Sequence, residues 1–270
     1  MRLIAVVAMF LSLFAGAARA EEEPKGRESD EEVARAAQNP VADIISIPFQ
    51  NNSNFGFGPG NDRTQNVLNI QPVLPFHLSK DWNLITRTIF PLVWQPSFTD
   101  GGTTFGLSNV AVTAFLSPAR PAAVIWGVGP VLTLPATSSA VGSSNTWGLG
   151  PSAVVLTMQG SWVVGVLVNN VWSFAGDSTN NFLLQYFINY NFGRTGWYVV
   201  SAPVITANWK ARSGQQWVVP FGAGGGKIVW VGKLPLNISA SAFYNVVHPD
   251  IGPLWQLRVS VTVLLPASLI

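Results

Sequence analysis

The feature that most constrains the fold of this 270-residue chain is a long series of apolar stretches, each roughly ten to thirteen residues long, separated by turn-forming residues. After residue 40 no segment sustains the 3.6-residue periodicity of a helix, and several alternate with the period of two that is typical of strands. A tilted strand needs about 9 to 11 residues to cross a bilayer, whereas strands of soluble proteins usually have about 5 or 6. We therefore predict twelve membrane-spanning strands. They cover residues 41–50, 66–76, 82–94, 106–116, 124–134, 147–158, 162–174, 181–192, 197–209, 217–229, 237–248 and 254–264.

The predicted connections alternate between short and long. Tight turns follow the even-numbered strands, at 79–81, 117–121, 159–161, 193–196 and 232–235. Longer links rich in Gly, Ser and Asn follow most odd-numbered strands, as at 51–62, 96–104 and 135–146. Outer-membrane barrels have short periplasmic turns and longer outer loops, and a soluble sandwich has no reason to sort its loops in this way. The sequence thus predicts an all-β fold, a transmembrane antiparallel β-barrel of about twelve strands.

The first forty residues have a different character. A positive start at Met1 and Arg2, an apolar stretch to residue 17 and a small-x-small site at 18–20 predict a signal peptide over residues 1–20, and hence export. Residues 21–40 form a polar leader in which Ser29 and Glu32 have the spacing of a helix capping box, so residues 30–37 are expected to form two helical turns. Two interpretations stay open for the leader: a mobile periplasmic segment, or a small helix that plugs the lumen. The barrel domain is predicted to span residues 41–270.

Composition excludes several other classes of protein. The chain has no cysteine, so disulfides and thiolate metal sites are excluded. Only 10% of residues are charged, against about 25% in soluble domains, while Trp numbers 11 and Phe 16. Many tryptophans fall near predicted strand ends, where an indole lies at the lipid headgroups. The scattered basic residues are too few for nucleic-acid binding. The expected partners are therefore outer-membrane lipid and the barrel assembly machinery.

Side-chain alternation assigns the two faces of the better strands. In 181–192, one face carries Gln185 and Asn189 and the other is aromatic and aliphatic, as expected for lipid contact. Charge on the inward face is limited mainly to Arg87 and Arg258, because an arginine on the lipid face near the midplane costs about 2 to 4 kcal/mol. The candidate lumen-facing residues are Asn69, Gln71, Arg87, Asn109, Thr113, Gln185, Asn189, Ser239, Ser241, Asn245 and Arg258.

A lumen with so little charge predicts an uncharged or hydrophobic solute rather than a cation, since pores select ions with charged rings. An alternative stays open, in which the inward polar side chains hydrogen-bond to one another and close the interior. Three prolines, Pro72, Pro203 and Pro220, fall inside predicted strands. Because proline lacks the N–H that a ladder needs, we predict bulges or strand ends at these positions.

Residues with catalytic or metal-binding chemistry are few. The segment 222–227 has the glycines and lysine of a phosphate loop but lacks its first glycine and its Ser or Thr, so we interpret it as small residues that allow a bulge or close packing. The two histidines, His77 and His248, are predicted at opposite ends of the barrel and cannot share a metal. We expect no cofactor and no catalytic residue. One enzymatic alternative is a lipid hydrolase in which a serine reaches His248 from a neighbouring strand.

Several short segments carry a family resemblance. They are NPVAD at 39–43, IPFQNN at 47–52, LNIQP at 68–72, WNLITR at 82–87, IWGVGP at 125–130 and WSFAG at 172–176. In these segments the chain resembles a family of predicted proteobacterial outer-membrane proteins, grouped with the outer-membrane proteins of the MetA pathway of phenol degradation. Many members carry the misleading name neuromedin U.

The resemblance implies a barrel in the outer membrane of a Gram-negative cell that admits hydrophobic or aromatic compounds, and it supplies no catalytic residues. The expected function is therefore that of a passive, porin-like channel or transporter for small uncharged or hydrophobic molecules. A closed structural or adhesive barrel is the alternative, and a lipid-modifying hydrolase is the third.

Overall fold

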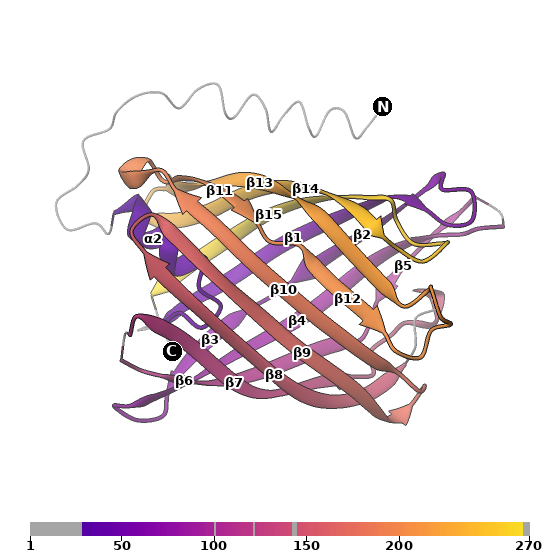
Figure 1. Ribbon diagram of the computed structural model, residues 1–270, viewed down its shortest axis with the longest axis horizontal. Coiled ribbons are helices and arrows are strands. Elements are labelled where there is room, and N and C mark those ends of the chain that lie inside the picture. Colours follow the sequence, from indigo (N-terminus) through magenta and orange to yellow (C-terminus); the bar gives the residue numbers. More distant parts are fainter. Residues whose placement is uncertain (1–28, 100, 121, 142–144, 267–270) are drawn as a thin grey trace.

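The chain forms a closed antiparallel β-barrel of twelve strands, seen from the side in Figure 1. The computed structural model describes residues 29–99, 101–120, 122–141 and 145–266, so the predicted signal peptide and residues 21–28 lie outside the described residues. The barrel closes because the first and last strands pair, from Ile44 opposite Pro266 to Phe55 opposite Trp255. The strand segments are β1 (Ile44–Phe57), β2 (Arg63–Ile70), β3 (Val73–His77), β4 (Trp82–Pro96), β5 (Thr103–Leu107), β6 (Val110–Pro118), β7 (Val124–Leu134), β8 (Thr146–Gln159), β9 (Trp162–Gly176), β10 (Asn180–Asn191), β11 (Trp197–Ser201), β12 (Val204–Asn208), β13 (Trp217–Val231), β14 (Leu234–Val247) and β15 (Trp255–Pro266).

Fifteen segments make twelve wall strands because three of the wall strands are interrupted. The interruptions fall between β2 and β3, between β5 and β6, and between β11 and β12. Pro72 and Pro203 lie in the first and third, and Pro220 lies at a register shift between β13 and β14. The prediction of bulges or strand ends at these three prolines is confirmed, because each lacks the N–H that a continuous ladder requires.

The two ends of the barrel differ in their connections, as the sequence predicts. One end, here the short-turn end, carries turns such as Ser79–Asp81 and the 3-10 helix η2 (Gly193–Thr195). The other, the long-loop end, carries the longer links, one of which includes the 3-10 helix η1 (Ser139–Val141). The loop predicted at 51–62 is too long, because β1 continues to Phe57. Its Asn-rich sequence suggests a loop, yet Asn52 and Asn54 are inward side chains that are 7% exposed.

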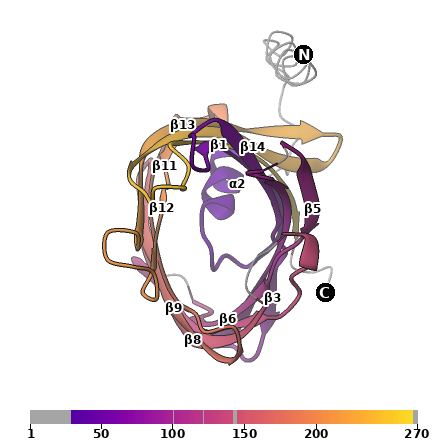
Figure 2. The same ribbon diagram turned by 90° about the vertical axis from the view of Figure 1, so that its right-hand side faces the viewer.

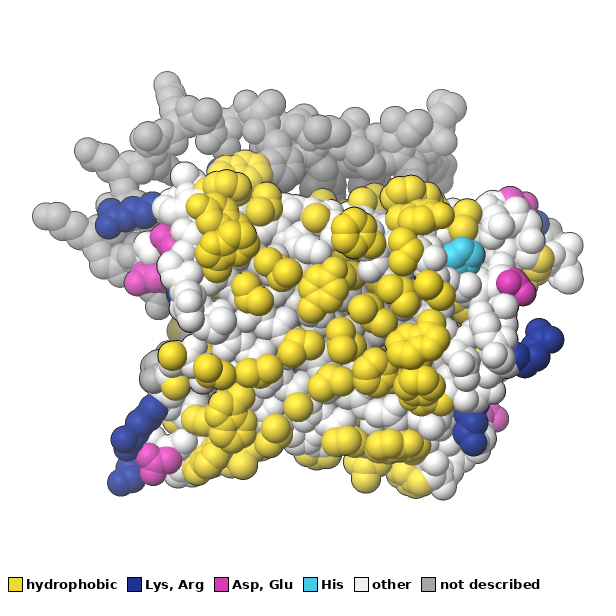
Figure 3. All heavy atoms as spheres, in the orientation of Figure 1, with side chains coloured by type: hydrophobic (Ala, Val, Ile, Leu, Met, Phe, Trp, Pro, Cys, Tyr) yellow, Lys and Arg dark blue, Asp and Glu magenta, His cyan; other side chains and the backbone are white. Residues whose placement is uncertain are grey.

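The outer face of the barrel is apolar. In β7, Val124, Trp126 and Val128 are exposed and alternate with inward residues. Figure 3 shows hydrophobic side chains over the middle of the barrel and charged side chains at both ends. Aromatic pairs lie near each end, with ring centroids 6.0 Å apart for Trp82 and Trp126 at the short-turn end and 4.7 Å apart for Tyr244 and Trp255 at the long-loop end. This is the arrangement of a lipid-facing band between two aromatic belts.

One α-helix, α2 (Asp30–Ala37), lies inside the barrel at the short-turn end (Figure 2). It begins with the predicted capping box, in which the backbone N–H of Glu32 donates to Ser29 Oγ and the backbone N–H of Ser29 donates to Glu32 Oε2. Its length is eight residues, and none of the helices among the described residues is long and apolar enough to cross a membrane.

The helix is held by an apolar cluster and by hydrogen bonds to the wall. Val33 and Ala34 are each 1% exposed and pack with Tyr198, Ile228 and Leu264, a cluster that we call the helix dock. Around this dock, Trp230 Nε1 donates to Asp30 Oδ1 at 2.7 Å, and Arg35 donates to the carbonyl of Gly160. The amides of Gln38 and Asn191 bond reciprocally, at 2.9 and 3.2 Å. The described part of the leader therefore forms a helix that is seated against the wall inside the barrel.

The capping box makes docking of α2 sensitive to Ser29 and to acid. The backbone N–H of Ser29 stabilises the Glu32 carboxylate and holds the pKa of Glu32 below its ordinary value. Because this contact lies within the helix, the lowered pKa stabilises the helical form that docks at pH above the ordinary glutamate range, and this stabilisation is lost as pH falls through the lowered value. Ser29→Ala is expected to weaken the helix by about 1 kcal/mol, whereas Ser29→Thr keeps the cap.

Because the chain has no cysteine, an Ala34→Cys reporter measures docking as the rate of its reaction with a thiol reagent. Because acid also removes the reactive thiolate, each rate is divided by that of an unfolded reference thiol at the same pH. Ser29→Ala should raise this relative rate at neutral pH, and acid should raise it in the Ser29 chain more than in Ser29→Ala. Equal rates in both chains at every pH would show that the cap does not stabilise the docked helix.

Candidate functional site

The interior of the barrel holds two cavities that share part of their lining. The larger, about 420 Å³, extends toward the long-loop end, where Asn54, Pro253 and Gln256 line it. The smaller, about 220 Å³, is lined at the short-turn end by Ala37, the last residue of α2, and by the three residues that follow it, Gln38, Asn39 and Pro40. The side chains that line both cavities, here called the shared ring, are Gln50, Gln71, Arg87, Leu167, Gln185 and Arg258.

Ten of the eleven candidate lumen residues from the sequence line one or both cavities. Those lining the larger are Asn69, Gln71, Arg87, Thr113, Gln185, Asn245 and Arg258, and those lining only the smaller are Asn189, Ser239 and Ser241. Asn109 is not among the described lining residues. It lies in the interruption between β5 and β6, where its Oδ1 accepts a hydrogen bond from Thr137 at 2.9 Å.

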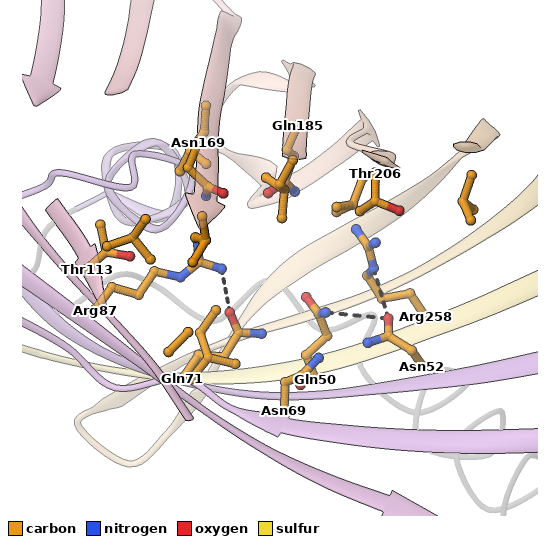
Figure 4. Close-up of a pocket in the computed structure, with 18 of the residues that line it drawn as sticks. Gln50, Asn52, Asn69, Gln71, Arg87, Thr113, Asn169, Gln185, Thr206 and Arg258 are labelled. Atoms are coloured by element: carbon orange, nitrogen blue, oxygen red, sulfur yellow. Dashed lines mark hydrogen bonds between the residues drawn. The ribbon is translucent and has the colours of Figure 1, made fainter. Parts of the chain in front are cut away.

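Arg258 is fixed in the lumen by several acceptors on neighbouring strands. Its Nε donates to Asn52 Oδ1 at 3.2 Å, and one terminal nitrogen donates to Gln256 Oε1 at 3.2 Å. The other terminal nitrogen donates to the carbonyl of Ala202 at 2.8 Å, in the interruption between β11 and β12. The guanidinium also lies over the ring of Phe243, 4.8 Å from its centroid, where cation–π attraction is favourable. These contacts orient the charge toward the cavity (Figure 4).

Arg87 extends into the same space from β4 (Figure 4). A terminal nitrogen of Arg87 donates to Gln71 Oε1, and Gln71 is itself 4% exposed. β2 ends at Ile70, so Gln71 lies with Pro72 in the interruption, and its side chain is placed by a strand end rather than by a continuous ladder. Arg87 and Arg258 line the same two cavities, so their positive charges repel each other.

The lumen is cationic because its arginines face no acid. None of the described residues lining either cavity is an aspartate or a glutamate. The Arg–Asp ion pairs among the described residues involve other groups, namely Arg63 with Asp62 and Arg120 with Asp81. Since effective dielectric constants are lower in a protein interior than in water, two unneutralised charges give the lumen a positive potential.

The larger cavity has two chemically different sides. Amide side chains from β1, β2, β14 and β15, the amide wall, are Gln50, Asn52, Asn54, Asn69, Asn245 and Gln256. Strands β4, β6, β7, β9, β10, β12 and β13 contribute the aliphatic and aromatic side chains, here called the apolar wall, namely Ile89, Ala111, Phe115, Val131, Leu167, Val171, Leu183, Val204 and Val218. Polar lining residues lie among and beside them, namely Arg87, Thr113, Thr133, Ser152, Asn169, Gln185 and Thr206. The cavity is therefore amphipathic and suits a molecule with a polar group and an apolar body.

The apolar wall continues into a packed cluster inside the barrel that the sequence interpretation missed. Ile85, Phe115 and Leu156 are at most 2% exposed, and Val41 from the chain after α2 packs on them. The signal was present in the alternation, since Ile85 and Arg87 are two residues apart and thus share a face. The sequence prediction named only the polar residues of that face as lumen-facing and so left out the apolar ones.

The side chains considered for metal binding or catalysis lie apart from one another in the described residues. Within the described ranges, no group of three or more His, Asp or Glu side chains is placed to hold a metal ion. His248 Nδ1 lies 2.8 Å from the carbonyl oxygen of Pro249, so this ring nitrogen contacts the backbone rather than a serine hydroxyl. His77 contacts Asp43 at 2.9 Å, near the short-turn end.

Known proteins similar to this chain were found by comparison of structures. No protein-family model and no curated protein sequence matched it. The barrel is similar to the crystal structure of an outer membrane channel from Pseudomonas putida F1, with a TM-score of 0.65 and 18% identity over 91% of this chain and 99% of that one. Outer membrane phospholipase A from Escherichia coli matches with a TM-score of 0.44 and 16% identity, over 88% of this chain and 98% of that one. At such identities the likeness concerns the fold alone, and the chain has the twelve-strand barrel fold of an outer-membrane protein.

Proposed function

We propose that this protein is a passive channel or transporter of the Gram-negative outer membrane, with its short-turn end in the periplasm. The observation that carries the proposal is the lumen, in which two cavities meet at a shared ring between the long-loop end and α2. The apolar outer band, the aromatic belts and the sorting of loops by length support the membrane location and orientation. The likeness to a barrel described as an outer membrane channel supports the channel role.

The proposed cargo is a small, predominantly apolar molecule. The apolar wall favours such a body, and the positive potential of the lumen disfavours cations. We also propose that the chain belongs with the outer-membrane proteins grouped with the MetA pathway of phenol degradation, on the strength of segments such as 82–87. An aromatic solute would suit that grouping.

Ion selectivity tests whether the lumen is a water-filled route. In a planar bilayer, the protein is expected to conduct with a preference for anions, and Arg87→Glu should shift the reversal potential toward cations, because it replaces a positive charge in the shared ring by a negative one. Arg120→Glu makes the same change in charge at an exposed turn, where Arg120 pairs with Asp81. It should shift the selectivity far less. Equal shifts in both variants would show that current does not pass Arg87.

A closed barrel is the second candidate, and the seat of α2 in the short-turn end favours it. Liposome swelling with small neutral solutes distinguishes the two. Swelling of liposomes that contain folded protein supports the channel. If the inserted protein gives neither swelling nor conductance, the channel proposal is contradicted and the closed barrel is supported.

A further inference from the structure

We propose that the shared ring binds the carboxylate of a small amphipathic molecule between Arg87 and Arg258, with the apolar part of that molecule against the apolar wall. This inference rests on the proposed function, because the molecule must enter the lumen. It narrows the cargo to predominantly apolar compounds that carry one negative group.

Both arginines have donors to spare. A guanidinium carries five N–H groups in a fixed fork. Arg258 uses three of its groups on Asn52, Gln256 and the carbonyl of Ala202. For Arg87 the acceptor among the described residues is Gln71, which leaves most of its fork toward the cavity (Figure 4). The protein thus orients both guanidinium groups but supplies acceptors for only some of their N–H groups.

Charge supplies the second argument. Two cations act on each other inside the lumen, and no described residue of the cavity lining is an acid. A bound anion would relieve this repulsion and satisfy the free N–H groups together. Because a carboxylate presents two coplanar oxygens that match the guanidinium fork, it is the anion best suited to this pair.

The apolar wall determines the chemistry of the part of the ligand that lies beyond its carboxylate. A phosphate or chloride ion would satisfy the arginines but would leave the apolar wall without a partner. A neutral apolar solute would contact that wall but would leave the arginine donors unsatisfied. A short aliphatic chain ending in a carboxylate satisfies both the two arginines and the apolar wall, and the cavity of about 420 Å³ has room for one.

Isothermal titration calorimetry of the full chain in lipid nanodiscs, against empty nanodiscs, tests the proposal. Hexanoate is compared with hexanamide, which has the same shape and no charge, and with acetate and inorganic phosphate, which lack the apolar chain. Hexanoate is expected to bind at least tenfold more tightly than each of the other three. Equal binding of hexanoate and hexanamide, or of hexanoate and phosphate, would overturn the proposal.

Variants locate the site. Arg87→Gln and Arg258→Gln should each weaken hexanoate binding by about tenfold or more, since charge-assisted hydrogen bonds are lost. Arg87→Lys keeps the charge without the fork and should fall between Arg87→Gln and the parent chain. Arg120→Gln, at the exposed turn, should bind as the parent chain does. Ile89→Asn should weaken binding of hexanoate more than that of acetate. Each variant is first shown to be folded by its heat-modifiable mobility on gels.

Binding and liposome entry, measured on the same protein, distinguish failure of this inference from failure of the proposed function. If hexanamide enters liposomes through the protein while hexanoate binds no better than hexanamide, the channel stands and the carboxylate site is wrong. If hexanoate binds as expected but no solute crosses, the site stands and the transport role is wrong.

Discussion

Replacing Val33 by aspartate is expected to raise the single-channel conductance several-fold. Val33 is 1% exposed within the helix dock, and burial of an unpaired carboxylate there costs several kcal/mol. The bonds that hold α2 contribute about 0.5 to 1.5 kcal/mol each, so the loss is comparable to the whole docking energy. The helix should leave the short-turn end and widen the path. Bilayer recordings measure the conductance, and the Ala34→Cys reporter shows whether the helix has moved.

The matched control is Ala36→Asp, which adds the same charge to the same helix outside the helix dock. It should leave conductance near that of the parent chain and should raise the labelling rate much less. If Val33→Asp exposes the reporter while the conductance stays the same, α2 does not limit the current, and the lumen is narrowed elsewhere.

Truncation of Phe115 to alanine is expected to lower the free energy of unfolding by about 3 to 5 kcal/mol, the usual range for a fully buried phenylalanine. Phe115 is 0% exposed, lies opposite Ile85 in the pairing of β4 with β6, and packs in the apolar cluster inside the barrel. The loss arises from removed contacts and from the cavity left behind. Urea titration of protein folded in lipid vesicles, followed by tryptophan fluorescence, measures it.

Phe98→Ala provides the comparison, because Phe98 is 41% exposed in a long loop. Its ring contacts that of Phe57 at 5.6 Å, so a loss of about 1 kcal/mol is expected. Similar losses at the two positions would indicate that the inside of the barrel is loosely packed and does not depend on the apolar cluster.

Local pattern predicted the wall of this barrel well because the wall obeys local rules. Lengths near those needed to cross a bilayer, alternation of faces and the sorting of connections each depend on a few successive residues. The inward positions of Arg87 and Arg258 followed from alternation, together with the high cost of arginine in lipid. The end of β1 was misplaced because asparagine has the same local signature in a loop and on a polar lumen face.

The contents of the lumen depend on distances that no local pattern contains. The bond from Arg258 to Ala202 joins residues 56 positions apart. The capping box predicted α2, but the seat of Val33 among Tyr198, Ile228 and Leu264 depends on the width of the closed barrel. Alternation within single strands indicates some members of the amide and apolar walls, but the two walls form only when eleven strand segments surround one space.

The interruption at Ala202 and Pro203 gives this barrel a kind of recognition element that barrel walls rarely offer. In an unbroken wall every main-chain carbonyl is engaged with the next strand, so only side chains face the interior. Here a main-chain oxygen is released inward and holds Arg258. Such an acceptor is independent of the side chain at residue 202, so sequence change there leaves it intact. The orientation of the Arg258 guanidinium thus depends on the backbone path set by Pro203. Substitution of the surrounding side chains would leave this backbone contact in place.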